Sequence, residues 1–234
     1  MKKCLIYIYL LLLTSLCCLQ AGAVSSEIRS LSVSDGLPDL VINTIYKDSK
    51  GYVWMGTNTS VERFDGIRLE HYMVEGSNEN LKRVFVLVEM PGNELWVGTG
   101  MGLFRLADDA EKLERLAPEM ITSGVHAFCK LGDVLYVGTE KGLYVYKGGV
   151  FEHVLVDKNV FSRANFVTGM VEGENGILWL STMGGLKSLR LSDQTITSFS
   201  DKLAKNGQNL SFYNVTRIGS KIFMGTMTSG LVLF

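Results

Sequence analysis

The hydrophobic residues of the chain fall into short runs, which are separated by clusters of glycine, asparagine, aspartate and lysine. Runs of this length between turn-forming residues predict β-strands, because a surface helix would show apolar residues three and four positions apart over a longer stretch. Only residues 108–116 carry a pattern that also allows a helix. The clearest predicted strands are residues 41–46, 84–88, 125–129, 166–171 and 214–218.

A short motif, in which an aromatic residue is followed by an apolar residue, glycine or serine, and threonine, occurs five times. The motifs occupy residues 54–57, 96–99, 136–139, 179–182 and 223–226. Their aromatic residues are 42, 40, 43 and 44 positions apart. A period of about 40–45 residues is typical of a β-propeller, in which each repeat forms one small sheet, called a blade. The sequence therefore predicts an all-β chain of five blades.

The residues around each motif repeat as well. Glycine-containing turns precede the motifs, and a Gly-Leu pair follows four of them, whereas the first unit has Ser60 and Val61 there. Fourth strands are predicted at residues 69–72, 150–155 and 195–199. We expect four-stranded antiparallel blades whose motif aromatic residues fill the space between neighbouring blades. The glycine would allow close backbone approach, and the threonine would bond to the backbone of the next turn.

The two ends of the repeats leave two architectures open. Residues 27–33 are predicted to form a lone outer strand before the first unit, and the fifth unit stops at Leu233 and Phe234, before a fourth strand. Five blades could close on themselves, or they could be an incomplete arc of a larger, seven-bladed ring. The arc is favoured because the chain ends inside a strand, with no polar segment to cover an exposed edge.

Residues 1–23 have the layout of a secretory signal peptide: two lysines, an apolar run over residues 5–13, and small residues before a cleavage site after Ala23. The apolar run is short for a membrane span. We therefore expect residues 24–234 to reach the periplasm as one set of propeller repeats, with no membrane contact of this segment itself.

The positions of the cysteines and the net charge argue against a disulfide framework and against nucleic-acid binding. Three of the four cysteines lie in the predicted signal peptide, so Cys129 has no disulfide partner in the exported part. Lipidation at Cys17 or Cys18 is a minority alternative, because Leu16 is not the small residue that this processing requires. Without the two lysines of the signal peptide, the net charge is −3. The chain has no basic run, which argues against nucleic acid as a partner.

With the motifs in place, the chain resembles a known family. Residues 35–38, 45–57 and 63–66 are similar in order and spacing to the two-component-regulator propeller repeat. The resemblance implies the periplasmic sensor of a hybrid two-component system of Bacteroidetes, anchored in the inner membrane in full-length members and recognising oligosaccharides. It further implies a histidine kinase and other output domains, which this chain does not contain, so the chain itself is not expected to be an enzyme.

No catalytic or metal-binding pattern stands out in the sequence. His71, His126 and His153 are isolated, Cys129 lies in an apolar strand, and Asp48 is explained as a turn residue. We therefore expect no cofactor, no metal and no catalytic residue. A propeller-fold lyase or hydrolase and a protein-interaction scaffold remain as alternatives, because acids from distant blades can converge and fold alone does not decide function.

A glycan site is expected in the loops at one end of the blades, where chain segments enter the first strands or join the middle strands. Aromatic faces stack on sugars, and planar polar groups bind hydroxyls. The residues expected to bind ligand on this reasoning are Asn58, Arg83, His126, Lys141, Phe161, Arg163 and Tyr213. Besides an oligosaccharide, the expected partners are the remaining propeller blades, or a second protomer, at the open edge.

Overall fold

The computed structural model describes residues 28, 30–74, 81–199 and 210–234. Its contacts divide the chain into residues 1–31 and residues 32–234, and the sheets belong to the second unit. The predicted signal peptide lies outside the described residues. In the part of the chain that is described, no helix is long and apolar enough to cross a membrane.

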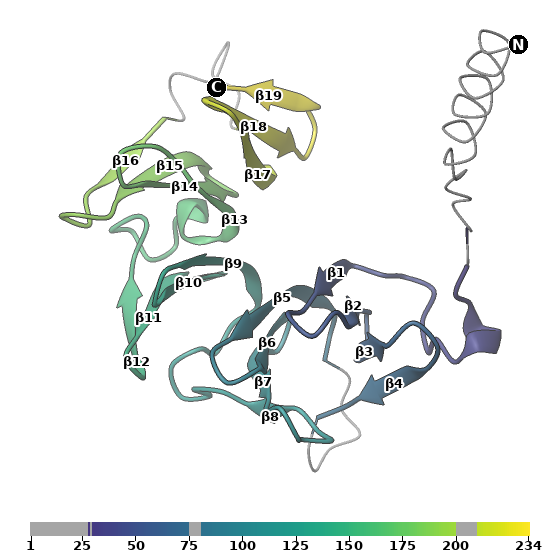
Figure 1. Ribbon diagram of the computed structural model, residues 1–234. Helices are drawn as coiled ribbons and strands as arrows, with labels where there is room; N and C mark the ends of the chain where they lie inside the picture. Colours follow the sequence, from purple (N-terminus) through teal and green to yellow (C-terminus); the bar gives the residue numbers. More distant parts are fainter. Residues whose placement is uncertain (1–27, 29, 75–80, 200–209) are drawn as a thin grey trace, which may run out of the picture. The chain divides into compact units, whose positions relative to one another are not determined.

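The described residues between 32 and 234 form five antiparallel sheets, in which neighbouring strands are consecutive in the chain (Figure 1). The first strands are β1 (Thr44–Lys47), β5 (Val84–Met90), β9 (Val125–Leu131), β13 (Val167–Glu172) and β17 (Phe212–Ile218). The second strands, which carry the motifs, are β2 (Val53–Gly56), β6 (Glu94–Thr99), β10 (Val134–Thr139), β14 (Ile177–Thr182) and β18 (Lys221–Thr226). The third strands are β3 (Val61–Phe64), β7 (Gly102–Leu106), β11 (Gly142–Lys147), β15 (Gly185–Arg190) and β19 (Leu231–Leu233).

Fourth strands complete four of the five sheets: β4 (Leu69–Tyr72), β8 (Glu114–Arg115), β12 (Val150–Val154) and β16 (Ile196–Ser198). The sheets are the predicted blades, and the fifth has three strands, as the sequence predicted. The first strand of each blade contacts that of the next, from β1 through β5, β9 and β13 to β17. Among the described residues, no strand contact of similar extent joins the fifth blade to the first. The five blades therefore do not close a ring among themselves.

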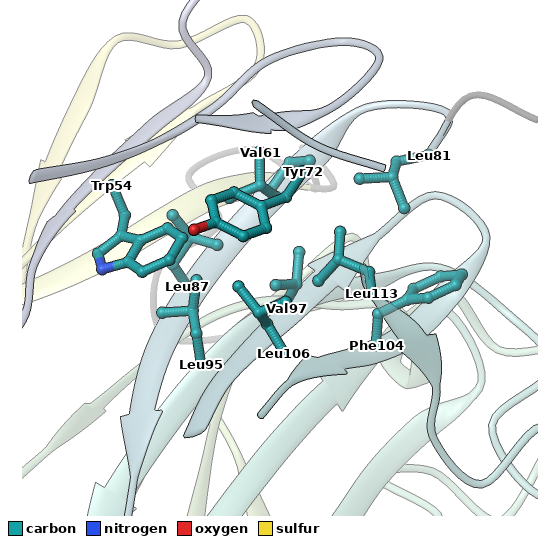
Figure 2. Packing of buried hydrophobic residues seen from close by; sticks show 11 residues of the cluster. Trp54, Val61, Tyr72, Leu81, Leu87, Leu95, Val97, Phe104, Leu106 and Leu113 are labelled. Carbon is teal, nitrogen blue, oxygen red and sulfur yellow. The ribbon is translucent and has the colours of Figure 1, made fainter. Parts of the chain in front are cut away.

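Four hydrophobic clusters lie between consecutive blades and form the core. In the first cluster, Trp54 and Tyr72 of blade 1 lie over Leu87 and Leu95 of blade 2 (Figure 2), with 5.4 Å between the Trp54 and Tyr72 ring centroids. The motif residues Trp96, Tyr136 and Trp179 take the same position in the next three clusters. The prediction that the motif aromatics fill the space between blades is confirmed for the four blades that are followed by another.

The motif glycines allow the blades to approach closely. A Cβ atom built on Gly56 would lie 2.5 Å from Cγ1 of Val84 in the next blade, and one on Gly138 would lie 2.8 Å from Cγ1 of Val167. Both distances are shorter than a carbon–carbon contact allows. In the fourth blade the motif has Ser181 instead of glycine. The space for its side chain is provided by Gly169, which pairs with Ser181 in the neighbouring strand, since a Cβ atom on Gly169 would lie 2.7 Å from the serine Oγ. Close packing between blades therefore requires glycine at this point.

The motif threonines close the loops that join the second and third strands. The Oγ1 of each threonine donates a hydrogen bond to a backbone carbonyl three or four residues later, at 2.7–3.2 Å. The five donors are Thr57, Thr99, Thr139, Thr182 and Thr226. Each Oγ1 also accepts a bond from a backbone N–H within the same loop. The predicted role of the threonine is confirmed in all five units.

One local prediction was wrong, and one helix that the pattern allowed is not formed. Residues 28 and 30–32 are not in a strand, and Val33–Asp35 form a 3-10 turn (η2) that the Ser32 and Asp35 side chains close, so a strand over residues 27–33 is contradicted. Residues 108–116, where a helix was allowed, form turns and the short strand β8. In the first segment, bonds of the Ser32 and Asp35 side chains close the turn, whereas in the second, β8 pairs with β7.

Candidate functional site

The site is built at one edge of the blades. At one edge of the blades, the first strands begin and loops join the second strands to the third; we call this the upper edge. The lower edge is the opposite one, which carries the hairpin turns between first and second strands. The predicted residues Asn58, Arg83, His126, Lys141 and Arg163 all lie at the upper edge.

Four first strands have a β-bulge just after they begin. The pairing of first and second strands skips one residue in β5, β9, β13 and β17, whereas β1 pairs without a shift. The skipped residues are Phe85, His126, Thr168 and Tyr213. Bulges redirect a side chain away from the regular alternation of a strand and are frequent beside functional sites. Each of these blades therefore presents one redirected side chain at equivalent positions of the upper edge.

The residue before each bulge fixes the strand in place. These residues are apolar and fully buried: Val84, Val125, Val167 and Phe212 are each 0% exposed. The three valines pack against the motif glycines of the preceding blade. The sequence thus places a buried anchor directly before the residue that the bulge turns outward.

Rings of three blades form a continuous row at this edge. The ring centroids of Phe85 and His126 are 4.1 Å apart, and those of His126 and Phe166 are 4.7 Å apart. The guanidinium of Arg83 lies 5.4 Å from the Phe85 centroid, at the other end of the row. We call Phe85, His126 and Phe166 the aromatic row. Partly exposed rings of this kind offer flat apolar faces for stacking.

His126 lies in the middle of the row. Its side chain is 14% exposed, and its Nε2 is 3.1 Å from Oε1 of Glu140. Burial lowers the pKa of His126 below its ordinary value, and the nearby Arg83 adds to this, although the bond to Glu140 opposes it. Burial between two rings therefore favours a neutral imidazole at neutral pH.

Arg83 is held in an uncommon backbone conformation. Both Lys82 and Arg83 have positive φ, 49° and 74°, in the region that disfavours residues with a Cβ atom. The Arg83 Nε donates to Oδ1 of Asn43 at 3.0 Å, and the Asn43 amide donates to Oδ1 of Asn58 at 3.1 Å. These bonds link the first blade to the aromatic row. Strained residues of this kind cluster at functional sites, which is consistent with a binding role for this edge.

The other predicted site residues join the row less directly. Lys141 follows Glu140, and its Nζ donates to Thr122 Oγ1 at 3.2 Å. Arg163, in the 3-10 turn η3 (Arg163–Asn165), donates to Ser211 Oγ of the fifth blade at 3.1 Å. Tyr213 occupies the bulge position of β17 and is 56% exposed. Phe161 is 91% exposed in the loop before η3, and only its backbone N–H bonds, to Asn159.

The sequence prediction missed Phe85, Phe166, Glu140 and Asn43. The bulge positions could have been found, because each follows an apolar residue by one position in corresponding parts of the repeat. Phe166 lies just before its strand and could not be found this way. The ligand-binding role of all these residues stays a prediction.

The remaining candidates have structural roles. His71 bonds Glu62 at 2.8 Å, and His153 bonds the Lys141 carbonyl at 2.9 Å. Burial raises the pKa of the Cys129 thiol to about 11, which suits a packing residue rather than a nucleophile. Asp48 accepts bonds from the Trp54 indole and the Tyr52 backbone, as expected of a turn residue. The described residues contain no group of three or more metal-ligating side chains.

Comparison with known proteins agrees with the repeat. Residues 36–59, which include the first motif, match the family model described as two-component regulator propeller. This segment of the chain matches the two-component regulator propeller repeat. This repeat protein is 27% identical over 220 residues to histidine kinase P4 of Formosa agariphila, a distant relative. The match covers 82% of this chain and 16% of the kinase, so the chain spans about a sixth of that relative.

Solved structures share the fold of this propeller chain. The extracellular domain of a protein described as a hybrid two-component system of B. thetaiotaomicron has a TM-score of 0.71 at 22% identity, over 88% of this chain and 30% of that one. A streptogramin B lyase has a TM-score of 0.60 at 14% identity, over 85% of this chain and 70% of that one. Because a sensor domain and an enzyme share the fold, function must be argued from the site.

Proposed function

We propose that this chain is the ligand-sensing propeller region of a hybrid two-component signalling protein, that it acts in the periplasm, and that it binds an oligosaccharide at the upper edge. The observation that carries the proposal is the aromatic row, in which bulges of two consecutive blades place Phe85 and His126, and Phe166 of the next blade continues the row. The similarity to extracellular domains of sensor proteins supports the signalling part.

The side chains of the aromatic row are better suited to binding a sugar than to cleaving one. Stacking uses the faces of Phe85 and Phe166, and hydroxyl groups would bond to Asn58, Glu140 and nearby cations. A glycosidase needs two carboxyl groups across the scissile bond. At the row, Glu140 is the carboxylate in contact, and it is already shared with His126. Binding without turnover is therefore the proposed role of the chain.

Calorimetric titration with a panel of oligosaccharides tests the binding part. We expect at least one oligosaccharide to bind. Phe85→Ala should weaken its affinity about tenfold, because stacking on one aromatic ring contributes on the order of 1 kcal/mol. Ile67→Ala serves as the control, since Ile67 is an exposed apolar residue of a lower-edge turn, 80% exposed. Lack of binding across the panel would contradict oligosaccharide sensing.

Two further measurements separate the alternatives. Release of products from polysaccharides, followed by chromatography, would favour an enzyme over a sensor. Capture of a defined partner chain from periplasmic extract, without saccharide binding, would favour a scaffold. For the signalling part, we expect the gene's reading frame to continue beyond Phe234 into further blades, a membrane helix and a kinase.

A further inference from the structure

The arginines of the two edges have different partners. At the lower edge, Arg68 has no ion pair with a described residue, whereas the other four arginines pair with carboxylates of described residues at 2.5–3.5 Å. These arginines are Arg63, Arg105, Arg190 and Arg217. Their charges are therefore compensated within the protein.

At the upper edge, the cations bond only neutral oxygens in the described part of the chain. Arg83 bonds the amide oxygen of Asn43, and Arg163 bonds the hydroxyl of Ser211. Lys141 bonds the hydroxyl of Thr122, and Arg115 bonds the Met101 carbonyl at 2.7 Å. No carboxylate of a described residue lies within ion-pair distance of any of the four side chains.

Two features hold these cations in place at the upper edge: an uncommon backbone conformation and hydrogen bonds between blades. Lys82 and Arg83, which begin the segment that leads into the aromatic row, are consecutive residues in the left-handed region. The bonds to Asn43 and Ser211 also cross from one blade to the next, which orients each guanidinium without pairing it to a carboxylate of a described residue. A guanidinium oriented by neutral acceptors keeps donors for a carboxylate or sulfate.

We infer that the ligand of the upper edge is anionic, namely an acidic oligosaccharide whose sugar rings stack on the aromatic row and whose carboxylate or sulfate groups pair with Arg83 and Arg163. This inference deepens the proposed function and rests on it. Hydrogen bonds between ionised partners are roughly twice as strong as neutral ones, so the charged groups would contribute most of the selectivity. Glu140 would select against a second anionic group beside His126.

The experiment compares matched pairs of saccharides in calorimetric titrations of the purified protein. The first pair is an oligogalacturonide and its methyl ester, which differ in carboxylate charge. The second pair is chondroitin sulfate and unsulfated chondroitin oligosaccharide, which differ in sulfate. We expect the more highly charged member of at least one pair to bind about tenfold more tightly, with an affinity that falls as salt is raised. Which pair shows the difference identifies carboxylate or sulfate as the recognised group.

Arginine variants locate the effect. Arg83→Gln and Arg163→Gln are each expected to remove most of the preference, whereas Arg190→Gln, which alters an ion-paired arginine of the lower edge, should retain it. Equal affinity within both pairs would overturn the anionic ligand and leave oligosaccharide sensing intact. Binding of no saccharide, neutral or charged, would contradict both. A preference that survives in Arg83→Gln and Arg163→Gln would overturn the assignment to this edge.

Discussion

The upper and lower edges of the blades differ in how their polar groups are satisfied. At the lower edge, a hollow of about 570 Å³ between blades 2 and 3 is lined by Trp96, Tyr146 and Phe151, yet the arginine beside it, Arg105, pairs with Glu94 and Glu114. At the upper edge the rings are arranged in a row, and the cations bond neutral oxygens. The hollow is also lined by Lys130, whose Nζ donates to the Glu89 carbonyl, so the contrast between the edges concerns the arginines.

This difference suggests that the lower edge contributes mainly to stability and the upper edge mainly to ligand binding. Ion pairs such as Lys50–Asp108 and the bond from Ser49 to Glu89 connect blades 1 and 2 near the lower edge. The upper edge instead carries the β-bulges, which weaken a sheet but redirect side chains. We therefore expect substitutions of lower-edge core residues to act mainly on folding, and substitutions at the upper edge to act mainly on ligand affinity.

The largest effect is expected from Trp96→Ala. Trp96 is 3% exposed and contacts Tyr146, at 4.7 Å between centroids, so the variant should lose about 3–5 kcal/mol of unfolding free energy. Urea unfolding followed by fluorescence or circular dichroism measures the loss. Tyr213→Ala, at an exposed bulge position, should cost less than about 1 kcal/mol. Similar losses in the two variants would contradict the division between the edges.

The next largest effect concerns the contact between blades. Gly138→Ala would place its Cβ atom 2.8 Å from Cγ1 of Val167, which predicts a loss of about 1–3 kcal/mol from overpacking. Adding Val167→Ala removes the crowded methyl group, so the double variant should lose less than the sum of the two single losses. A double-mutant cycle by urea unfolding tests this coupling. Strict additivity would show that the glycine is not required for close approach.

The repeat explains why so much of the fold could be predicted from the sequence. Thr57 and its counterparts close the same loop in every blade, and the motif glycine recurs in four of the five, so the same residue types return at a nearly constant spacing. Fourth strands such as Leu69–Tyr72 also match their predicted bounds. The segment at residues 27–33 could not be predicted in this way, because it has no counterpart elsewhere in the chain.

The site was harder to predict because it depends on contacts between blades. Arg83 and His126 were among the predicted residues, but their link passes through Phe85, whose direction is set by a bulge. Strand alternation alone would place Phe85 differently. The neutral partners of Arg83 and Arg163 come from other blades, 40 and 48 residues away in sequence. A local sequence pattern therefore does not indicate whether such a cation forms an ion pair in the fold.

A smaller effect is expected from relief of backbone strain at the upper edge. Lys82→Gly replaces an exposed residue that has a φ of 49°, and glycine adopts this region without steric cost. We expect the unfolding free energy to rise by up to about 1 kcal/mol. Lys47→Gly, in strand β1, is the control and should lower stability by a similar amount. A loss of stability in Lys82→Gly would show that this segment is not strained.

The smallest expected effect is the pH dependence that His126 contributes at the upper edge. Its pKa in the folded protein lies below the ordinary value of 6.5, chiefly through burial, with Arg83 acting in the same direction and Glu140 against it. As pH falls through 6.5, the unfolded chain therefore binds a proton before the folded protein does. By linkage, this histidine's contribution to stability is present above that pH and is lost as pH falls toward the folded pKa.

Urea midpoints at pH 7.5 and 5.5 measure this contribution. We expect His126→Gln to reduce the loss of stability between the two pH values, because the variant removes the group that the folded state keeps neutral. Ile67→Ala, which alters an exposed residue without a titratable group, should lose stability between the two pH values as the unaltered protein does. If His126→Gln shows the same pH dependence as the unaltered protein, the imidazole is not buried within the aromatic row, and the row would have to be placed differently at the upper edge.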